Sequence, residues 1–225
     1  MQCTKKGRSI LISIKYKSFV QIKEDKKVYF GGDQSWWKDT NSIMREAGCG
    51  VIAMCNLELY LNGGCKKGIS YCDYISYVQR RHKETYSINQ NIFKLVGLTP
   101  RVMERGLDAF FQERCLNPII SWAPTVNKKR IRKLMEKMLG NNIPIVASYY
   151  VFNKKRKLDL YTYDEEADTL RKEAKIGSHY FNVVGIASRD NRDLLIISTW
   201  GQKYYAYFDE WVKKISIFTN ILYVE

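Results

Sequence analysis

The sequence predicts an α+β fold in which a buried helix packs against an antiparallel β-sheet. Helical patterns dominate the first part of the chain, and strand patterns dominate the part after Pro144. The run that follows Cys49 is hydrophobic on nearly every side of a helix, and such a helix is typically buried. We expect a single domain over residues 1–225, with a helical lobe at about 31–140 and a β-rich lobe at about 141–225.

The helical part is preceded by residues 9–30, which alternate between polar and apolar as a strand does. The apolar helix that begins at Cys49 ends near Gly63, because glycine is typical of helix C-termini. Further segments have the spacing of helices that pack one face on a core. These segments are 71–86, 100–115 and 127–139.

After Pro144 the hydrophobic period becomes that of strands. The segments that we expect to form strands are 145–152, 180–187, 194–198, 204–208 and 217–224. A highly charged segment at 153–175 follows the first of them. We favour a long hairpin there, and a mobile flap is the alternative.

The net charge of +14 raises nucleic acid as a partner. The basic clusters, at 128–130, 132–133 and 154–157, lack interleaved aromatic side chains and any helix-turn-helix pattern. We therefore expect solvated helix faces and a hairpin tip, and no nucleic-acid partner. The alternative is an acidic partner, such as an acyl-carrier protein, that is steered to this surface electrostatically.

Other classes of protein are disfavoured by what the sequence lacks. No apolar run is long enough to cross a bilayer, and the N-terminus has no apolar signal-peptide core, so we expect a cytoplasmic protein without a membrane partner. Six cysteines without a Cys-x-x-Cys pair, together with two distant histidines, predict neither a disulfide scaffold nor a metal site. We expect no cofactor.

One cysteine stands where a helix would activate it. Gly48-Cys49-Gly50 leads directly into the apolar helix, so the Cys49 thiol would lie at the first turn. Unpaired N–H groups and the positive end of the macrodipole favour a thiolate there. A thiolate is the nucleophile of covalent catalysis. The alternative is a half-buried structural cysteine beside a glycine turn.

Two histidines are candidate bases for that thiol. His82 lies in a charged stretch at 80–84, which predicts a solvated helix face whose cations lower the imidazole pKa. His179 begins a strand, after Gly177 and Ser178, and would lie at the end of that strand, where a substrate could reach it. We expect His179 to be the base, and a structural histidine is the alternative.

Four short motifs follow one another along the chain. They are Gly-Gly-Asp-Gln-Ser-Trp-Trp at 31–37, Ala-Gly-Cys-Gly at 47–50, Ser-His-Tyr at 178–180 and Ile-Ser-Thr-Trp-Gly at 197–201. In this order they resemble the papain-like cysteine peptidases, and more closely the bacterial peptidase C39-like branch. The resemblance spans about residues 28–210. It implies a papain-like fold in which Cys49 and His179 face each other across a cleft.

The resemblance also implies roles for single residues. Cys49 would be the nucleophile, His179 the acid–base partner, and Gln34 an oxyanion-hole donor beside the Cys49 backbone N–H. Substrate would lie along Trp36, Gly48 and Trp200. Gln34 stands 15 residues before Cys49, a longer interval than in papain, so the segment between them must loop out.

A second departure concerns the group that orients the histidine. The family usually places Asn or Asp where this chain has Ser198. A hydroxyl can hold the ring but cannot balance an imidazolium charge, and Asn182 and Thr199 are alternatives for the same role.

The expected function is acyl transfer through a Cys49 thioester, with hydrolysis of a peptide or amide bond as the first choice. An amide-forming acyltransferase that takes its acyl group from a carrier-protein thioester is the alternative. A catalytically silent binding module on the same scaffold is the second alternative, motivated by Ser198.

Overall fold

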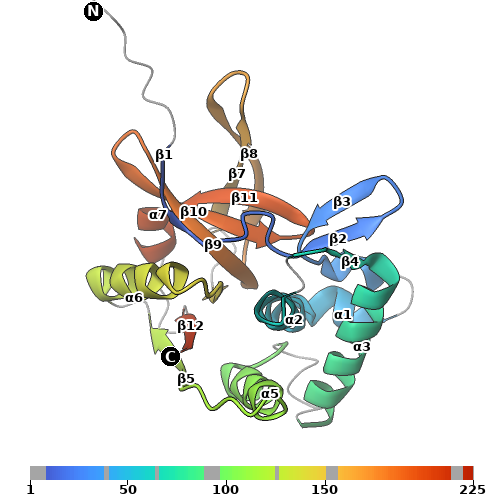
Figure 1. The fold of residues 1–225 in the computed structure, drawn as a ribbon. Coiled ribbons are helices and arrows are strands. Elements are labelled where there is room, and N and C mark those ends of the chain that lie inside the picture. Colours follow the sequence, from blue (N-terminus) through green and yellow to red (C-terminus); the bar gives the residue numbers. More distant parts are fainter. Residues whose placement is uncertain are drawn as a thin grey trace, which may run out of the picture.

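The computed structural model describes residues 9–37, 41–63, 66–88, 97–124, 127–150, 157–213 and 220–224. Within these residues the architecture is mixed α+β, with a large antiparallel sheet, a smaller three-stranded sheet and helices around them (Figure 1). The α+β class predicted from the sequence is confirmed.

The helices are η1 (Gln34–Trp37), α1 (Ser42–Ala47), α2 (Cys49–Leu61), α3 (Tyr71–Ile88), α5 (Pro100–Gln112), α6 (Lys128–Gly140) and α7 (Phe208–Lys213). The strands are β1 (Ser9–Ser13), β2 (Gln21–Glu24), β3 (Lys27–Phe30), β4 (Ile69–Ser70), β5 (Ile120–Pro124), β6 (Ile145–Tyr149), β7 (Leu158–Asp164), β8 (Thr169–Ile176), β9 (His179–Arg189), β10 (Arg192–Thr199), β11 (Gln202–Tyr207) and β12 (Asn220–Val224).

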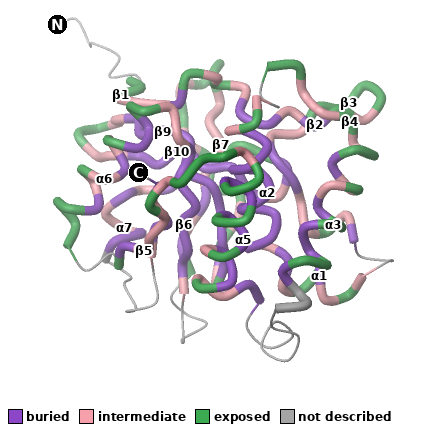
Figure 2. The backbone as a smooth tube through the Cα atoms, turned by 60° about the horizontal axis from the view of Figure 1, so that its bottom comes forward, coloured by how far each residue is buried: buried purple, intermediate pink, exposed green. Residues whose placement is uncertain are grey.

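The large sheet has the strand order β5-β12-β6-β9-β10-β11-β7-β8, and β1 pairs with the later part of β9. β9 lies near its centre and is buried from His179 to Ala187, because β6, β1 and β10 flank it and α2 covers it (Figure 2). β1, which precedes the helices, and β5, which lies between α5 and α6, also join this sheet.

Helix α2 forms the centre of the helical side. Its residues from Gly50 to Tyr60 are buried, as the apolar sequence predicts. It packs against β9 on one side and against α3 and α5 on the others (Figure 1). A helix enclosed in this way holds its first residue, Cys49, in a fixed place relative to the sheet.

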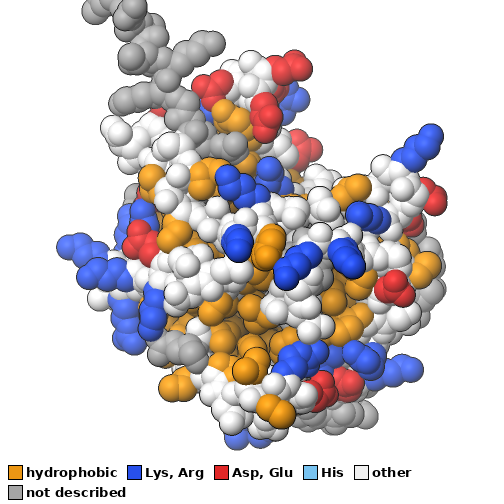
Figure 3. Space-filling model, in the orientation of Figure 1, with side chains coloured by type: hydrophobic (Ala, Val, Ile, Leu, Met, Phe, Trp, Pro, Cys, Tyr) orange, Lys and Arg blue, Asp and Glu red, His pale blue; other side chains and the backbone are white. Residues whose placement is uncertain are grey.

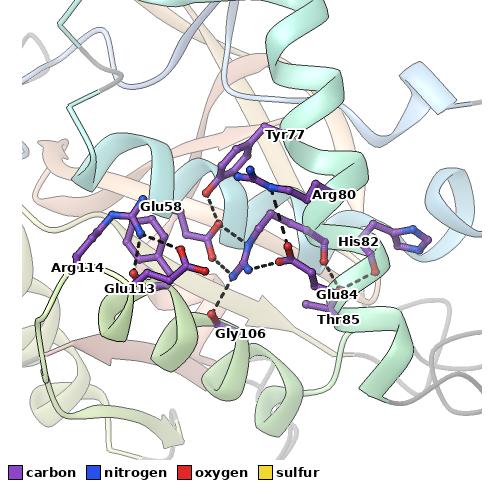
Figure 4. A network of polar contacts seen from close by, with 11 residues as sticks. Glu58, Tyr77, Arg80, His82, Glu84, Thr85, Gly106, Glu113 and Arg114 are labelled. Carbon is purple, nitrogen blue, oxygen red and sulfur yellow. Dashed lines mark hydrogen bonds and ion pairs between the residues drawn. The ribbon is translucent and has the colours of Figure 1, made fainter.

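A buried ion pair joins α2 to α3 (Figure 4). Glu58 Oε1 lies 2.5 Å from Arg81 Nη2, and the Tyr77 hydroxyl donates to Glu58 Oε2 at 2.7 Å. Burial raises the pKa of Glu58, and Arg81 opposes that rise. The neighbouring His82 is only 8 % exposed, so the solvated position predicted from its charged sequence is wrong.

Some strand predictions differ from the structure. Residues 9–30 form three short strands rather than one, because the chain turns at Phe19 and Asp25, both with positive φ. The charged segment 153–175 is a hairpin, β7–β8, in its described part. Residues 217–219 of the last predicted strand lie outside the described residues, as do Cys3, Cys65 and residues 154–156 of the basic cluster at 154–157. In the part that is described, no helix is long and apolar enough to cross a membrane.

Candidate active site

The turn from α1 into α2 places Cys49 at the start of the buried helix. Gly48 caps this start, and a Cβ there would overlap the Met44 carbonyl oxygen. A Cβ on Gly50 would lie 2.7 Å from Leu98 Cβ and 3.2 Å from the Tyr180 ring. Close packing on both sides therefore requires the Gly-Cys-Gly sequence.

The Cys49 thiol is half-buried beside β9. Burial raises its pKa, while hydrogen bonds from the backbone of Tyr180, Gly50 and Cys49 itself act in the opposite direction. The sequence predicted a lowered pKa from the helix N-terminus, and this direction is wrong because desolvation outweighs the backbone donors. The Tyr180 contact places the sulfur next to the strand residue that follows His179.

His179 is the first residue of β9 and is 9 % exposed. Its Nε2 lies 2.7 Å from Thr199 Oγ1, and the Trp200 ring covers it with the ring centroids 5.2 Å apart. Burial lowers the His179 pKa to about 4. The imidazole is therefore neutral near neutral pH, and Thr199 occupies Nε2, so Nδ1 is the ring nitrogen that Thr199 leaves open.

The sequence predicts that Ser198 orients the His179 ring. In the structure the hydroxyl that contacts this ring belongs to Thr199 instead. Adjacent residues of a strand point to opposite faces. Ser198 Oγ donates to the Phe30 carbonyl at 2.8 Å. Asn182, the other alternative, is hydrogen-bonded to Asn56 and to the Ala53 carbonyl.

The position of Thr199 and Trp200 follows from a tight turn. β10 ends at Thr199 and β11 begins at Gln202, and the two residues between them have φ of 50° and 69°. Positive φ at both central residues is typical of the two-residue turns that fit the twist of a hairpin. The Trp200-Gly201 pair thereby holds an indole over the histidine.

Gln34 lies in η1 and borders the same cavity as Cys49. Its Nε2 donates to the Arg45 carbonyl at 2.6 Å, and its Oε1 is buried without a hydrogen bond in the described structure. An amide nitrogen carries two N–H bonds, so one donor is left for an oxyanion.

The long interval between Gln34 and Cys49 is folded. Residues 34–37 form η1, residues 42–47 form α1, and residues 38–40 lie outside the description. The hydrogen bond from the Gln34 side chain to the Arg45 carbonyl joins the two ends of this segment, just before α2 begins.

The two predicted tryptophans have different surroundings. Trp200 borders the cavity, whereas Trp36 is not among its lining residues. Trp36 packs against Tyr29 and Tyr71, with ring centroids 5.0 Å apart in both cases. Its surroundings are those of a packing residue, and Gly48 contributes only the turn before Cys49.

These side chains converge on a small cavity of about 10 Å³, which is room for about one water molecule. Its lining residues are Gly32, Gln34, Cys49, Ile52, Ala53, Asn56, His179, Tyr180, Phe181, Asn182, Ser198, Thr199 and Trp200. None of these is a carboxylate, so no negative charge there stabilises an imidazolium. Among the described residues, no three His, Cys, Asp or Glu side chains gather as metal ligands would.

No protein-family model matches the chain, and no curated protein matches it. The likeness to papain-like peptidases therefore stays a hypothesis drawn from the four short motifs. Of the residues that those motifs supply, Gln34, Cys49, His179, Ser198 and Trp200 border one cavity.

Proposed function

We propose that this chain is a cysteine-dependent acyl-transfer enzyme of papain-like fold, related to the peptidase C39-like branch, that hydrolyses a peptide or other amide bond. The observation that carries the proposal is the meeting of Cys49, His179 and Thr199 at one cavity, with His179 Nε2 held by Thr199. A nucleophile, a base and a group that orients the base are the parts that covalent catalysis needs.

The burial of both partners decides how the pair would work. Burial raises the Cys49 pKa and lowers that of His179 to about 4, so the resting pair is a thiol and a neutral imidazole. If Nε2–H donates to Thr199, the Nδ1 lone pair can accept the thiol proton. His179 then acts as a general base during attack, rather than as one half of a resting ion pair.

The proposed reaction proceeds by acylation of the thiol. The Cys49 sulfur attacks the substrate carbonyl while its proton passes to His179 Nδ1. The oxyanion accepts hydrogen bonds from the Cys49 backbone N–H and the remaining Gln34 N–H. Collapse transfers the imidazolium proton to the leaving amine and forms a thioester. Water attacks the thioester, with His179 again taking and returning the proton, and the carboxylic acid leaves as Cys49 recovers its thiol.

An amide-forming acyltransferase is a second candidate, favoured by the surface of α6. Lys128, Lys129, Arg130 and Lys133 are exposed on this helix, whose one carboxylate, Glu136, is paired with Arg132 at 2.7 Å. Figure 3 shows Lys and Arg side chains grouped over α6, at the left of the view. Such a surface suits an acidic carrier protein as the acyl donor.

A binding module without catalysis is the third candidate. It is favoured by the neutral state of Cys49 and His179 and by the absence of a carboxylate among the residues that line their cavity. In that case the thiol would be unreactive and ligand binding would survive Cys49→Ala.

The pH dependence of thiol alkylation by iodoacetamide, read by peptide mass spectrometry, tests the proposal. The exposed Cys72 and Cys115 are internal references. A thiol without a paired base reacts as its thiolate, so its labelling slows about tenfold for each pH unit below its pKa. Cys49 labelling should instead be nearly constant from about pH 5 to about pH 8, because the proton stays within the thiol–imidazole pair.

The His179→Ala variant completes this test. Without the imidazole, Cys49 should behave as a buried thiol of raised pKa and should label more slowly than Cys72. If Cys49 follows the exposed cysteines in the wild type and the variant changes nothing, the enzyme proposal fails and the binding module stands.

A further inference from the structure

Two buried asparagines near the cavity are hydrogen-bonded to each other. Asn56 Nδ2 donates to Asn182 Oδ1 at 3.1 Å, and the two residues are 1 % and 0 % exposed. Asn56 Oδ1 accepts from the Gly32 N–H at 3.3 Å and from the Tyr74 hydroxyl at 2.9 Å. Asn182 Nδ2 donates to the Ala53 carbonyl at 2.9 Å. In both amides, therefore, the nitrogen donates a hydrogen bond and the oxygen accepts at least one.

This Asn56–Asn182 pair connects the three segments that bear the candidate active-site residues. Asn56 stands about two turns after Cys49 in α2, so both face the same side of that helix. Asn182 belongs to β9, the strand that begins with His179. Gly32 belongs to the loop that leads into Gln34. The two amides border the cavity itself.

A merely space-filling role does not require amides at these positions. Buried amides lose hydration, and apolar side chains of similar shape fill such sites at comparable or lower free energy. Hydrogen bonds add direction and a fixed separation, which apolar contacts lack. The fit is tight, because a Cβ on Gly32 would overlap the Tyr74 hydroxyl that shares Asn56 Oδ1.

We propose that Asn56 and Asn182 are positioning residues that set the separation between the Cys49 thiol and the His179 imidazole. They act through the backbone of α2 and β9 and do not touch substrate. The inference rests on the proposed function, since it concerns the geometry of the same thiol–imidazole pair. Removing the Asn182 amide should break the hydrogen bonds that join β9 to α2. The effect of His179 on the Cys49 thiol should then weaken.

A double-mutant cycle separates positioning from stability. The rate constant for Cys49 alkylation by iodoacetamide at about pH 6 is measured in the wild type, His179→Ala, Asn182→Leu and the double variant. Asn182→Leu should lower the rate to about the level of His179→Ala, and the double variant should be no slower than either single variant. Thr85→Val is the matched control, because among the described residues the buried Thr85 hydroxyl donates to carbonyls of its own helix alone. The labelling rate of this variant should equal that of the wild type.

Each outcome decides one claim. If His179→Ala labels like the wild type, the proposed function fails. If His179→Ala is slow but Asn182→Leu labels like the wild type, the function stands and the positioning role is refuted. Equal slowing by Thr85→Val would also refute it, since any buried polar loss would then have the same effect. Should Asn182→Leu not fold, Asn182→Ala removes the same two hydrogen bonds and carries the same test.

Discussion

The buried imidazole of His179 makes the stability of the protein depend on pH in a way that can be isolated. Its pKa is lowered from the ordinary 6.5 to about 4 by burial. Between these values the unfolded chain binds a proton that the folded chain does not, so the free energy of unfolding falls as the pH falls. The stabilisation that depends on neutral His179 is fully present above pH 6.5, the pKa of the unfolded chain. It is lost progressively as the pH falls toward about 4, the pKa in the folded protein.

The magnitude follows from the size of the change in pKa. A decrease from 6.5 to about 4 lowers the free energy of unfolding by about 2 kcal/mol between about pH 7 and about pH 5, and by about 3 kcal/mol at about pH 4. The measurement is urea denaturation of the wild type and of His179→Gln across this range. Contributions of His82 and Glu58, whose pKa values are also shifted by burial, occur in both proteins and cancel in the difference.

The difference in free energy of unfolding between the two proteins should therefore shrink, or change sign, as the pH falls. A difference that stays constant from about pH 7 to about pH 5 would refute the reasoning. It would mean that His179 is hydrated in the folded protein, and a hydrated imidazole would rest as an imidazolium at mildly acid pH.

Other predictions concern single substitutions. Glu58→Gln leaves the buried guanidinium of Arg81 without its main counter-charge and should lower the free energy of unfolding by about 3–5 kcal/mol in urea denaturation. A loss below about 1 kcal/mol would contradict the buried ion pair. Thr199→Val should slow acylation of the Cys49 thiol by about 10²-fold, because the imidazole loses its orienting contact. Ser198→Ala should slow it much less, and the reverse order of effects would return the orienting role to Ser198. Gly50→Ala should destabilise by about 1–3 kcal/mol in thermal unfolding, because the added methyl lies 2.7 Å from a neighbouring Cβ; an unchanged midpoint would show that the neighbour yields freely.

The parts of the fold that the sequence predicts are those with a strong local pattern. The apolar run after Cys49 has no polar side, and the structure encloses that helix on all sides. The charged segment at 153–175 has the length and flanks of a hairpin, and its described part forms one. In both places the local pattern and the tertiary structure favour the same conformation.

The features that the sequence does not predict depend on distant contacts. His82 has charged neighbours in sequence, yet the fold buries its side chain. The choice between Ser198 and Thr199 depends on which face of β10 meets His179. The pairing of β9 with β10 shifts between Ile196 and Ile197, so simple alternation could not assign that face.

The aromatic cluster around Trp36 shows a similar limit. The resemblance placed this indole along the substrate, but its partners, Tyr29 and Tyr71, come from a strand and a helix that the motif does not contain. Likewise, the bond from Asn56 to Asn182 joins residues far apart in the chain. No local pattern distinguishes either contact from an ordinary buried side chain.

The most direct test of the central claim is to look for an acyl group on Cys49. The protein would be incubated with an activated acyl ester, p-nitrophenyl acetate, and the modified cysteines identified by peptide mass spectrometry in the wild type, His179→Ala and Cys49→Ala. We expect an acetyl thioester on Cys49 of the wild type, none on Cys49 of His179→Ala, and equal background at Cys72 and Cys115 in all three proteins. Acetylation of Cys49 that is no greater than that of Cys72, and that persists without His179, would contradict the central claim.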